Sequence, residues 1–235
     1  SQCVAIRPSA HNAAHPRTFA ACRLFGRSIV SFGQSNTGHH SRVLQRPGAT
    51  GDVALAALRS SGVDCSGVAI IDGGRTRRAV VMVDGKGERC IVTYRKGLAD
   101  QASLLPDDPL DDVGVRLGDS RWPVGAQAAV VRARAKGIPT VVDIDGGDRA
   151  MTERLVGQSD HAIFSSEGLR DYAGEGSPAD QLMGLPQAPG QILAVTRGSA
   201  GSVWRIGREV VTVPAFAVKV EDTTGCGDVF HGAYA

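Results

Sequence analysis

The residues best suited to chemistry lie near the end of the chain, in the run Gly225-Cys226-Gly227-Asp228. The two glycines have no side chains, so the backbone N–H groups of residues 225–228 can crowd together and point in one direction. Such amides at the start of a helix bind anions, because they are unpaired and the helix dipole favours negative charge. The sequence therefore predicts an anion-binding turn that leads into a helix.

Asp228 places a carboxylate inside this turn. At rest the carboxylate would repel a bound phosphate. As a general base it could instead take a proton from a hydroxyl group while the amides stabilise charge on the transferred group. This is the chemistry of phosphoryl transfer to an alcohol. The alternative is a glycine-rich loop that caps a helix, with Asp228 interacting only with the helix dipole.

The run D-T-T-G-C-G-D-V-F at residues 222–230 resembles the C-terminal motif of the ribokinase-like (PfkB) carbohydrate kinases, D-T-T-G-A-G-D-x-F. Cys226 replaces one small residue with another. The resemblance implies Asp228 as the catalytic base. It further implies that Gly225, Cys226 and Gly227 form an anion hole. It also implies a monovalent cation such as K⁺ near Asp222 and Thr223.

Alternating strand and helix patterns must position this turn. From residue 113 onward, strands are expected at 113–117, 140–142, 161–164 and 192–195, with helices at 123–136 and 150–156 between them. This alternation predicts a parallel sheet with helices on its faces. Ligands of such sheets bind at the C-terminal ends of the strands. Polar residues or glycines end these four strands and are expected to form a rim: Asp119, Asp143, Ser166 with Glu167, and Thr196 with Gly198.

Two stretches of this rim resemble cofactor sites of the family. T-R-G-S-A-G at residues 196–201 resembles the nucleotide loop T-x-G-x-x-G, which implies that Thr196, Gly198 and Gly201 bind ATP. The alternative is a tight turn into a hairpin formed by residues 202–205 and 209–213. Glu167 lies where many members have N-x-x-E, which implies a contact with Mg²⁺ through water, although the asparagine is absent here. Residues 174–190 are expected to form a loop with one short helical turn.

The first half of the chain resembles the family less closely. Residues 27–32 are expected to form a strand, residues 33–50 a polar loop in which Asn36 would contact the sugar, and residues 52–59 a helix. After a turn at residues 62–64, strands are expected at 68–71, 79–83 and 89–94, the last two as a hairpin. In the family such strands (here about 68–96) form a lid over the sugar and can pair with a second subunit, so the resemblance implies a homodimer. Arg95 could face the substrate, with a solvated edge of the lid as the alternative.

Composition limits the class of protein. No apolar run approaches the roughly 18–20 residues that span a bilayer, so no membrane partner is expected. Five scattered cysteines without a C-x-x-C pair fit reduced thiols in a cytoplasm. Residues 1–51 contain no acidic residue, six arginines and four of the six histidines. This acid-poor segment has three interpretations: a targeting peptide, a nucleic-acid-binding arm or poorly ordered sequence. We expect residues 1–26 to be poorly ordered.

We therefore expect an α/β ribokinase-like domain over residues 27–235, with a central, mostly parallel sheet, flanking helices and a small β lid. The resemblance implies ATP-dependent phosphorylation of a sugar hydroxyl with Mg²⁺, a small-molecule partner and no nucleic acid. It also suggests a domain incomplete at its C-terminus, so a truncated or degenerate, non-catalytic homologue is an alternative, and a nucleoside kinase is another. His231 is expected to pack against the sheet, with a substrate contact as its alternative.

Overall fold

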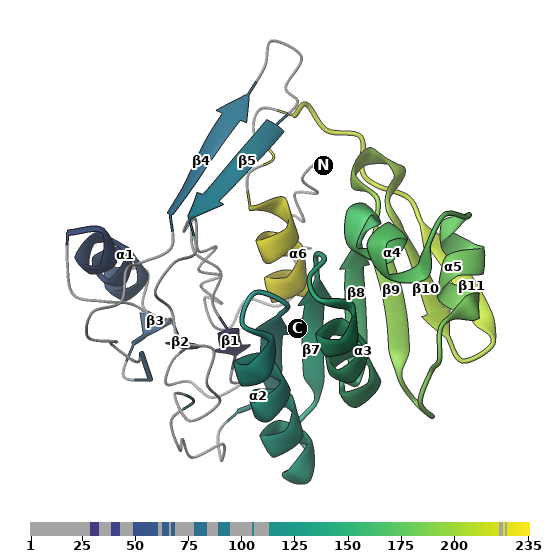
Figure 1. Cartoon of the computed structure of the whole chain (residues 1–235), viewed down its shortest axis with the longest axis horizontal. Helices are drawn as coiled ribbons and strands as arrows, with labels where there is room; N and C mark the ends of the chain where they lie inside the picture. Colours follow the sequence, from purple (N-terminus) through teal and green to yellow (C-terminus); the bar gives the residue numbers. More distant parts are fainter. Residues whose placement is uncertain are drawn as a thin grey trace, which may run out of the picture.

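The computed structural model describes residues 29–32, 39–42, 49–60, 63–65, 67–68, 78–83, 89–94, 105, 113–220, 223 and 225–235. The predictions for residues 1–26, Asn36, Arg95 and Asp222 lie outside the described residues. The described strands form a nine-stranded sheet in the order β11-β10-β9-β8-β7-β6-β1-β2-β3, and a separate two-stranded sheet of β4 and β5 (Figure 1).

Four parallel strands form the centre of the large sheet: β6 (Val115–Asp119), β7 (Thr140–Ile144), β8 (His161–Ser165) and β9 (Ile192–Thr196). Helices connect them: α2 (Pro123–Ala135), α3 (Arg149–Gln158), and α4 (Ser166–Ala173) followed by α5 (Pro178–Gly184). The predicted strand–helix alternation is confirmed, and so is the short helical turn within residues 174–190.

The margins of the sheet are mixed. β10 (Ser202–Ile206) and β11 (Glu209–Val213) extend it past β9 as an antiparallel hairpin, as predicted. On the other side, β1 (Ile29–Phe32) lies antiparallel to β6, β2 (His39–Arg42) antiparallel to β1, and β3 (Val63–Asp64) parallel to β2. The parallel arrangement is therefore a property of the centre of the sheet.

Helices cover both faces of the sheet, because alternate strand residues point to opposite faces. On one face, Ala162 and Phe164 of β8 belong to the buried cluster that α2, α3, α4 and α5 cover. On the other face, Ile163 belongs to a second buried cluster. Against that second cluster pack aromatic side chains of β10 and of α6 (Cys226–Tyr234), namely Trp204, Phe230 and Tyr234. Thus α6 faces this second cluster, and in Figure 1 it lies between the β4–β5 hairpin and β7.

The helices of the central units begin where the sequence supplies a capping group. Pro123 occupies the first turn of α2, where its missing N–H causes no loss. The side chains of Asp148, Ser165 and Ser177 accept hydrogen bonds from backbone N–H groups at the starts of α3, α4 and α5. These caps fix where each helix starts relative to the strand before it.

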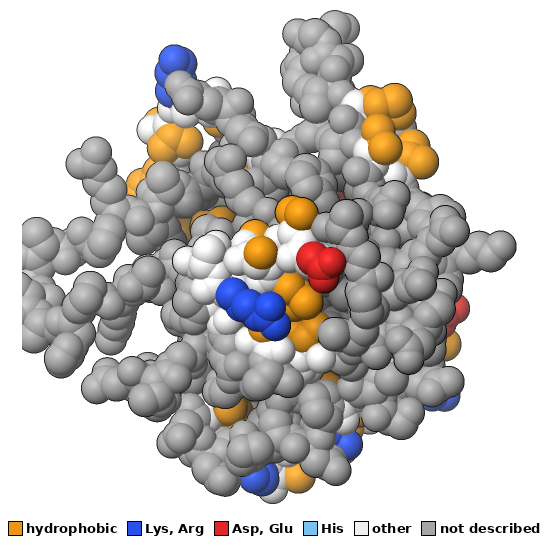
Figure 2. Space-filling model, turned by 90° about the vertical axis from the view of Figure 1, so that its left-hand side faces the viewer, with side chains coloured by type: hydrophobic (Ala, Val, Ile, Leu, Met, Phe, Trp, Pro, Cys, Tyr) orange, Lys and Arg blue, Asp and Glu red, His pale blue; other side chains and the backbone are white. Residues whose placement is uncertain are grey.

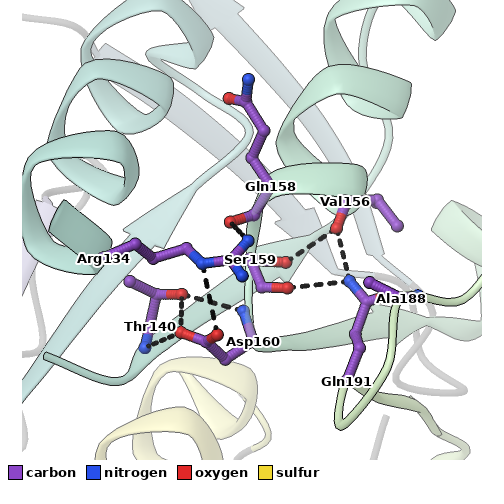
Figure 3. A network of polar contacts seen from close by, with 8 residues as sticks. All are labelled: Arg134, Thr140, Val156, Gln158, Ser159, Asp160, Ala188 and Gln191. Carbon is purple, nitrogen blue, oxygen red and sulfur yellow. Dashed lines mark hydrogen bonds and ion pairs between the residues drawn. The ribbon is translucent and has the colours of Figure 1, made fainter. Parts of the chain in front are cut away.

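A network of polar contacts holds the other end of the central strands (Figure 3). The Asp160 carboxylate accepts hydrogen bonds from the Thr140 N–H at 2.9 Å and the Thr140 hydroxyl at 2.7 Å, which links the starts of β7 and β8. The buried Gln191 side chain donates to the carbonyls of Val156 at 2.6 Å and Ser159 at 2.8 Å. The loop before β9 is therefore tied to the end of α3.

The small sheet consists of β4 (Arg78–Val83) and β5 (Arg89–Tyr94), which pair antiparallel as the predicted hairpin. It stands apart from the large sheet (Figure 1). Val80, Met82 and Val92 are exposed, and Val80 is paired directly with Val92. Because residues two apart share a face, these three apolar side chains lie on one face of the hairpin.

Helix α1 (Ala49–Ser60) lies beside β3 and includes the residues of the predicted helix at 52–59. It buries Leu58 against Val63 and exposes Asp52 and Arg59. Figure 2 turns this side of the molecule towards the viewer and shows acidic, basic and hydrophobic side chains close together. Among the described residues, no helix is long and apolar enough to cross a membrane.

Three local predictions differ from the structure, and one helix was not predicted. Val68, the described residue of the expected strand at 68–71, is not in a strand, and the expected turn at 62–64 contains β3. The expected polar loop at 33–50 contains β2. The rim after β8 continues directly into the unpredicted helix α4. The strands β2 and β3 depend on partners outside their own segments, because β2 pairs with β1 and with β3.

Candidate active site

The turn before α6 has the backbone conformation that the sequence predicts. Gly225 is the N-cap, with φ 76° and ψ 10°, a left-handed conformation that costs other residues about 1–2 kcal/mol. The N–H of Cys226 donates to the Thr223 carbonyl at 3.3 Å, and the N–H of Val229 donates to the Gly225 carbonyl at 3.0 Å. Gly225 provides no side-chain cap, so backbone acceptors such as the Thr223 carbonyl serve the start of the helix.

Asp228 lies in the first turn of α6 and is exposed. A Cβ atom added to Gly225 would lie 3.8 Å from its Oδ2 atom, so the carboxylate reaches back towards the N-cap. A Cβ added to Gly227 would meet nothing within 4 Å among the described residues. The turn thus combines a carboxylate, a helix N-terminus and open space beside Gly227.

The Cys226 side chain is disulfide-bonded, which differs from the expectation that the cysteines are reduced. Cys65, in contrast, is not disulfide-bonded, and its thiol donates to the Val63 carbonyl at 3.5 Å. Because the backbone of Cys226 starts α6, its proposed part in the anion hole depends on its amide and not on its sulfur.

The polar residues that end the central strands share one edge of the sheet, as predicted. Asp119 is paired with Asp143, and Ser165 with Thr196, at the C-terminal ends of their strands. The Ser166 hydroxyl donates to the Thr196 carbonyl at 2.9 Å. The rim is therefore confirmed as an arrangement, although its binding role remains a prediction.

His231 connects the turn to this rim. It is buried in α6, and its Nε2 atom lies 3.7 Å from Oδ1 of Asp143 on β7. The prediction that His231 packs against the sheet is confirmed. The start of α6 consequently lies at the edge of the sheet where the polar strand ends meet.

A second charged pair at this edge was not predicted from the sequence. Arg121 donates to the Asp145 carboxylate at 2.7 Å, and the Arg121 N–H donates to Asp119 at 2.7 Å. The run Val141-Val142-Asp143-Ile144-Asp145 was the signal available in the sequence, because it places two acidic residues at the end of one buried strand.

The predicted nucleotide loop forms a tight turn. Thr196 ends β9, and Gly198–Ala200 form one turn of 3₁₀ helix. Gly201 has φ 80°, and a Cβ there would lie 2.0 Å from the Val213 carbonyl oxygen of β11. Packing therefore accounts for Gly201 and supports the hairpin alternative at that position. The parts of Thr196 and Gly198 in nucleotide binding stay predictions.

The predicted magnesium contact lies at the same edge. Glu167 is exposed in the first turn of α4, whose N-terminus is capped by Ser165. No cluster of three or more possible metal ligands occurs among the described residues. A Mg²⁺ ion here would therefore depend on phosphate oxygens and water for most of its ligands, as Mg²⁺ commonly does. Asp222 and Thr223 are predicted to lie near a monovalent cation, and of these two residues the structure describes Thr223.

Comparisons with known proteins agree with this arrangement. The model of the pfkB family carbohydrate kinases matches residues 47–235. Fructokinase-1 of Zea mays is 30% identical over 204 residues, which cover 78% of this chain and 62% of the relative. The chain thus spans about three fifths of that relative's length.

Solved structures share the fold. A fructokinase from Xylella fastidiosa with bound ATP has a TM-score of 0.70 and 23% identity, over 92% of this chain and 69% of its own. An E. coli protein in complex with ATP and Mg²⁺ has a TM-score of 0.70 and 19% identity, over 92% of this chain and 71% of its own. At these identities the likeness concerns the fold.

Proposed function

Because the chain belongs to the pfkB family of carbohydrate kinases, we propose that it phosphorylates a hydroxyl group of a small sugar with ATP as donor. The observation that carries this proposal is the turn at residues 225–228. It places the exposed Asp228 carboxylate at the start of α6, beside space at Gly227 that the described residues leave open. A base next to an anion site is the arrangement that phosphoryl transfer to an alcohol requires.

In this mechanism Asp228 accepts the proton of the sugar hydroxyl as its oxygen attacks the phosphoryl group. The backbone amides of Gly225, Cys226 and Gly227 stabilise the negative charge on the transferred group, with the positive end of the α6 dipole behind them. These groups are positioned before the reaction, because the left-handed Gly225 fixes the turn. Exclusion of water by the β4–β5 hairpin would prevent transfer to water.

ATP would lie along the C-terminal edge of the sheet, with Thr196 and Gly198 towards its phosphates and Gly201 shaping the loop. Mg²⁺, when bound, would neutralise phosphate charge, and Glu167 is the residue we assign to its water shell. We also assign a K⁺ ion to the vicinity of Asp222 and Thr223. The solved neighbours that contain ATP, in one case with Mg²⁺, support the choice of cofactors.

The exposed apolar face of the β4–β5 hairpin, formed by Val80, Met82 and Val92, supports a role as a lid that also pairs two subunits. The homodimer belongs to this proposal. We also propose a cytoplasmic location, because ATP is available there.

The test is a coupled ADP-release assay with ATP, Mg²⁺, K⁺ and a panel of sugars. Asp228→Asn keeps the size of the side chain and removes the base, so we expect kcat to fall by about 10²–10⁴-fold. Asp180→Asn is the matched control, because Asp180 is also an exposed carboxylate in the first turn of a helix but lies in α5. Its kcat should equal that of the wild type.

The outcomes separate the alternatives. Sugar-dependent turnover that Asp228→Asn leaves intact would refute the assignment of the base. Turnover with nucleosides and not with sugars would establish the nucleoside kinase. Folded protein without turnover on either panel would favour the non-catalytic homologue.

A further inference from the structure

The His231 side chain lies directly beneath the turn at residues 225–228. Its Nδ1 atom is 2.7 Å from the Gly227 carbonyl oxygen. A carbonyl oxygen only accepts hydrogen bonds, so Nδ1 carries the hydrogen and donates it. The carbonyl has two lone pairs and can accept this bond together with the helical bond from the His231 N–H. The imidazole therefore holds the residue next to Asp228.

The other side of the imidazole faces the sheet. Nε2 is buried, has no hydrogen-bond partner among the described residues, and lies 3.7 Å from Oδ1 of Asp143. Asp143 is paired with Asp119 at the C-terminal end of β7. The His231 ring is thus interposed between the first turn of α6 and the strand end beneath it.

Packing restricts the ring further. His231 is 4% exposed, and the Phe230 ring meets it edge-on with centroids 5.7 Å apart. At the far end of α6, the Tyr234 hydroxyl lies 2.8 Å from Nδ1 of His161 at the start of β8. The two histidines therefore connect opposite ends of α6 to the sheet, but only His231 contacts the turn that carries Asp228.

We propose that His231 is a positioning residue that holds the turn at residues 225–228 against β7 and so aims the Asp228 carboxylate. This inference rests on the proposed function, in which Asp228 is the base. Misplacement of a catalytic group by about 1 Å can lower the rate by about 10²-fold. His231 would therefore affect the chemical step without touching substrate.

Substitutions at this position separate the two sides of the ring. His231→Phe keeps the volume and removes both nitrogens. His231→Asn retains a donor near the position of Nδ1, and His231→Gln retains one near Nε2. We expect His231→Phe to lower kcat by between about 10-fold and 100-fold, with the KM values for ATP and sugar little changed. His231→Asn should restore most of the rate, because it can still donate to the Gly227 carbonyl.

Tyr234→Phe is the matched control, because it removes a polar contact from the same helix at the opposite end. It should lower the thermal midpoint while leaving kcat unchanged. If Tyr234→Phe and His231→Phe lower kcat equally, or if neither Asn nor Gln restores activity, the residue is merely structural and the proposal is overturned.

Hydrogen exchange tests the same proposal without activity. In His231→Phe, the backbone amides of residues 225–229 should exchange at least about tenfold faster than in the wild type, whereas those of β8 should not change. His231→Asn should exchange at the wild-type rate. Unchanged exchange in His231→Phe would overturn the proposal. A wild-type protein without turnover but with this exchange pattern would refute the kinase proposal and leave the role of His231 in holding the turn intact.

Discussion

Gly225 and Gly227 are two residues apart and lack a side chain for different physical reasons. At Gly225 the backbone has φ 76°, a conformation that a Cβ atom disfavours. At Gly227 no positive φ occurs, and a Cβ would enter space that the described residues leave open. The first glycine therefore shapes the turn, whereas the second leaves room beside it.

This difference predicts opposite effects of alanine on stability. Gly225→Ala should lower the free energy of unfolding by about 1–2 kcal/mol because of the left-handed backbone. Gly227→Ala should raise it by up to about 1 kcal/mol, since alanine favours the helix. The measurement is urea unfolding of both variants beside the wild type.

Activity should depend on the space beside Gly227 and not on the stability of the variant. Gly227→Ala should lower kcat/KM by about tenfold or more even though it stabilises the protein, because its methyl group occupies the space proposed for the phosphoryl group. A Gly227→Ala protein that is more stable and fully active would show that the phosphoryl group lies elsewhere.

At the scale of the elements, α4 packs unusually close to β7. A Cβ at Gly168 of α4 would lie 2.3 Å from the Ile144 carbonyl oxygen, where no real Cβ fits. The absence of a side chain at Gly168 thus brings α4 onto the strand end beside the site. Because α4 begins directly after β8, the same contact fixes the position of Glu167.

We therefore expect Gly168→Ala to destabilise the protein by about 1–3 kcal/mol, through displacement of α4. Gly157→Ala is the control, because Gly157 is also helical, in α3, and a Cβ there meets nothing within 4 Å. That variant should be neutral or more stable by up to about 1 kcal/mol. Urea unfolding of both variants measures these changes. Equal effects of the two substitutions would contradict the close approach of α4 to β7.

The opposite end of β7 and β8 depends on the hydrogen bonds from Thr140 to Asp160. Thr140 is fully buried, so Asp160→Ala would leave the Thr140 N–H without an acceptor. We expect the free energy of unfolding to fall by about 1–3 kcal/mol. Arg134→Ala removes a 3.4 Å contact to Asp160 and a 2.8 Å hydrogen bond to the Gln158 carbonyl. Because the Arg134 side chain is 44% exposed, the loss should be about 1 kcal/mol or less. Chemical unfolding measures both, and a larger loss for Arg134→Ala would contradict this ranking.

At the scale of the whole molecule, α6 joins the turn at residues 225–228, at one edge of the sheet, to the starts of the strands at the other edge. Tyr234, at the end of α6, contacts His161, at the start of β8. Burial lowers the pKa of His161 below its ordinary value of 6.5, while the nearby Asp160 carboxylate acts in the opposite direction. The folded protein therefore favours the neutral imidazole.

The sign of the resulting pH dependence follows from this shift. As the pH falls through about 6.5, the unfolded chain binds a proton at His161 before the folded protein does, so stability is lost. Above that pH, where His161 is neutral in both the folded and the unfolded protein, this loss of stability does not occur. We expect His161→Gln to lose less stability than the wild type between pH 7 and pH 5 in urea unfolding. Equal losses in the two proteins would show that other groups govern the acid sensitivity.

The sequence alone determined much of the candidate site, because that site is built from local rules. The glycine spacing at 225–228 and the carboxylate at Asp228 sufficed to predict a turn, a helix and an anion site. The strand ends at Asp119, Asp143 and Thr196 also followed, since hydrophobic periodicity locates buried strands without knowledge of their partners.

Only the tertiary structure decided the remainder, because it depends on residues far apart in the chain. β2 and β3 exist through pairing with other strands, and neither carries a strong local pattern. The close approach of the β11 backbone to Gly201 also needed the structure, because Gly201 directly precedes β10 whereas Val213 ends β11. The approach of His231 to Asp143 joins positions separated by four strands and three α-helices, so no spacing in the sequence could reveal it. Local chemistry is encoded in short motifs, whereas the contacts that aim it arise only when the sheet assembles.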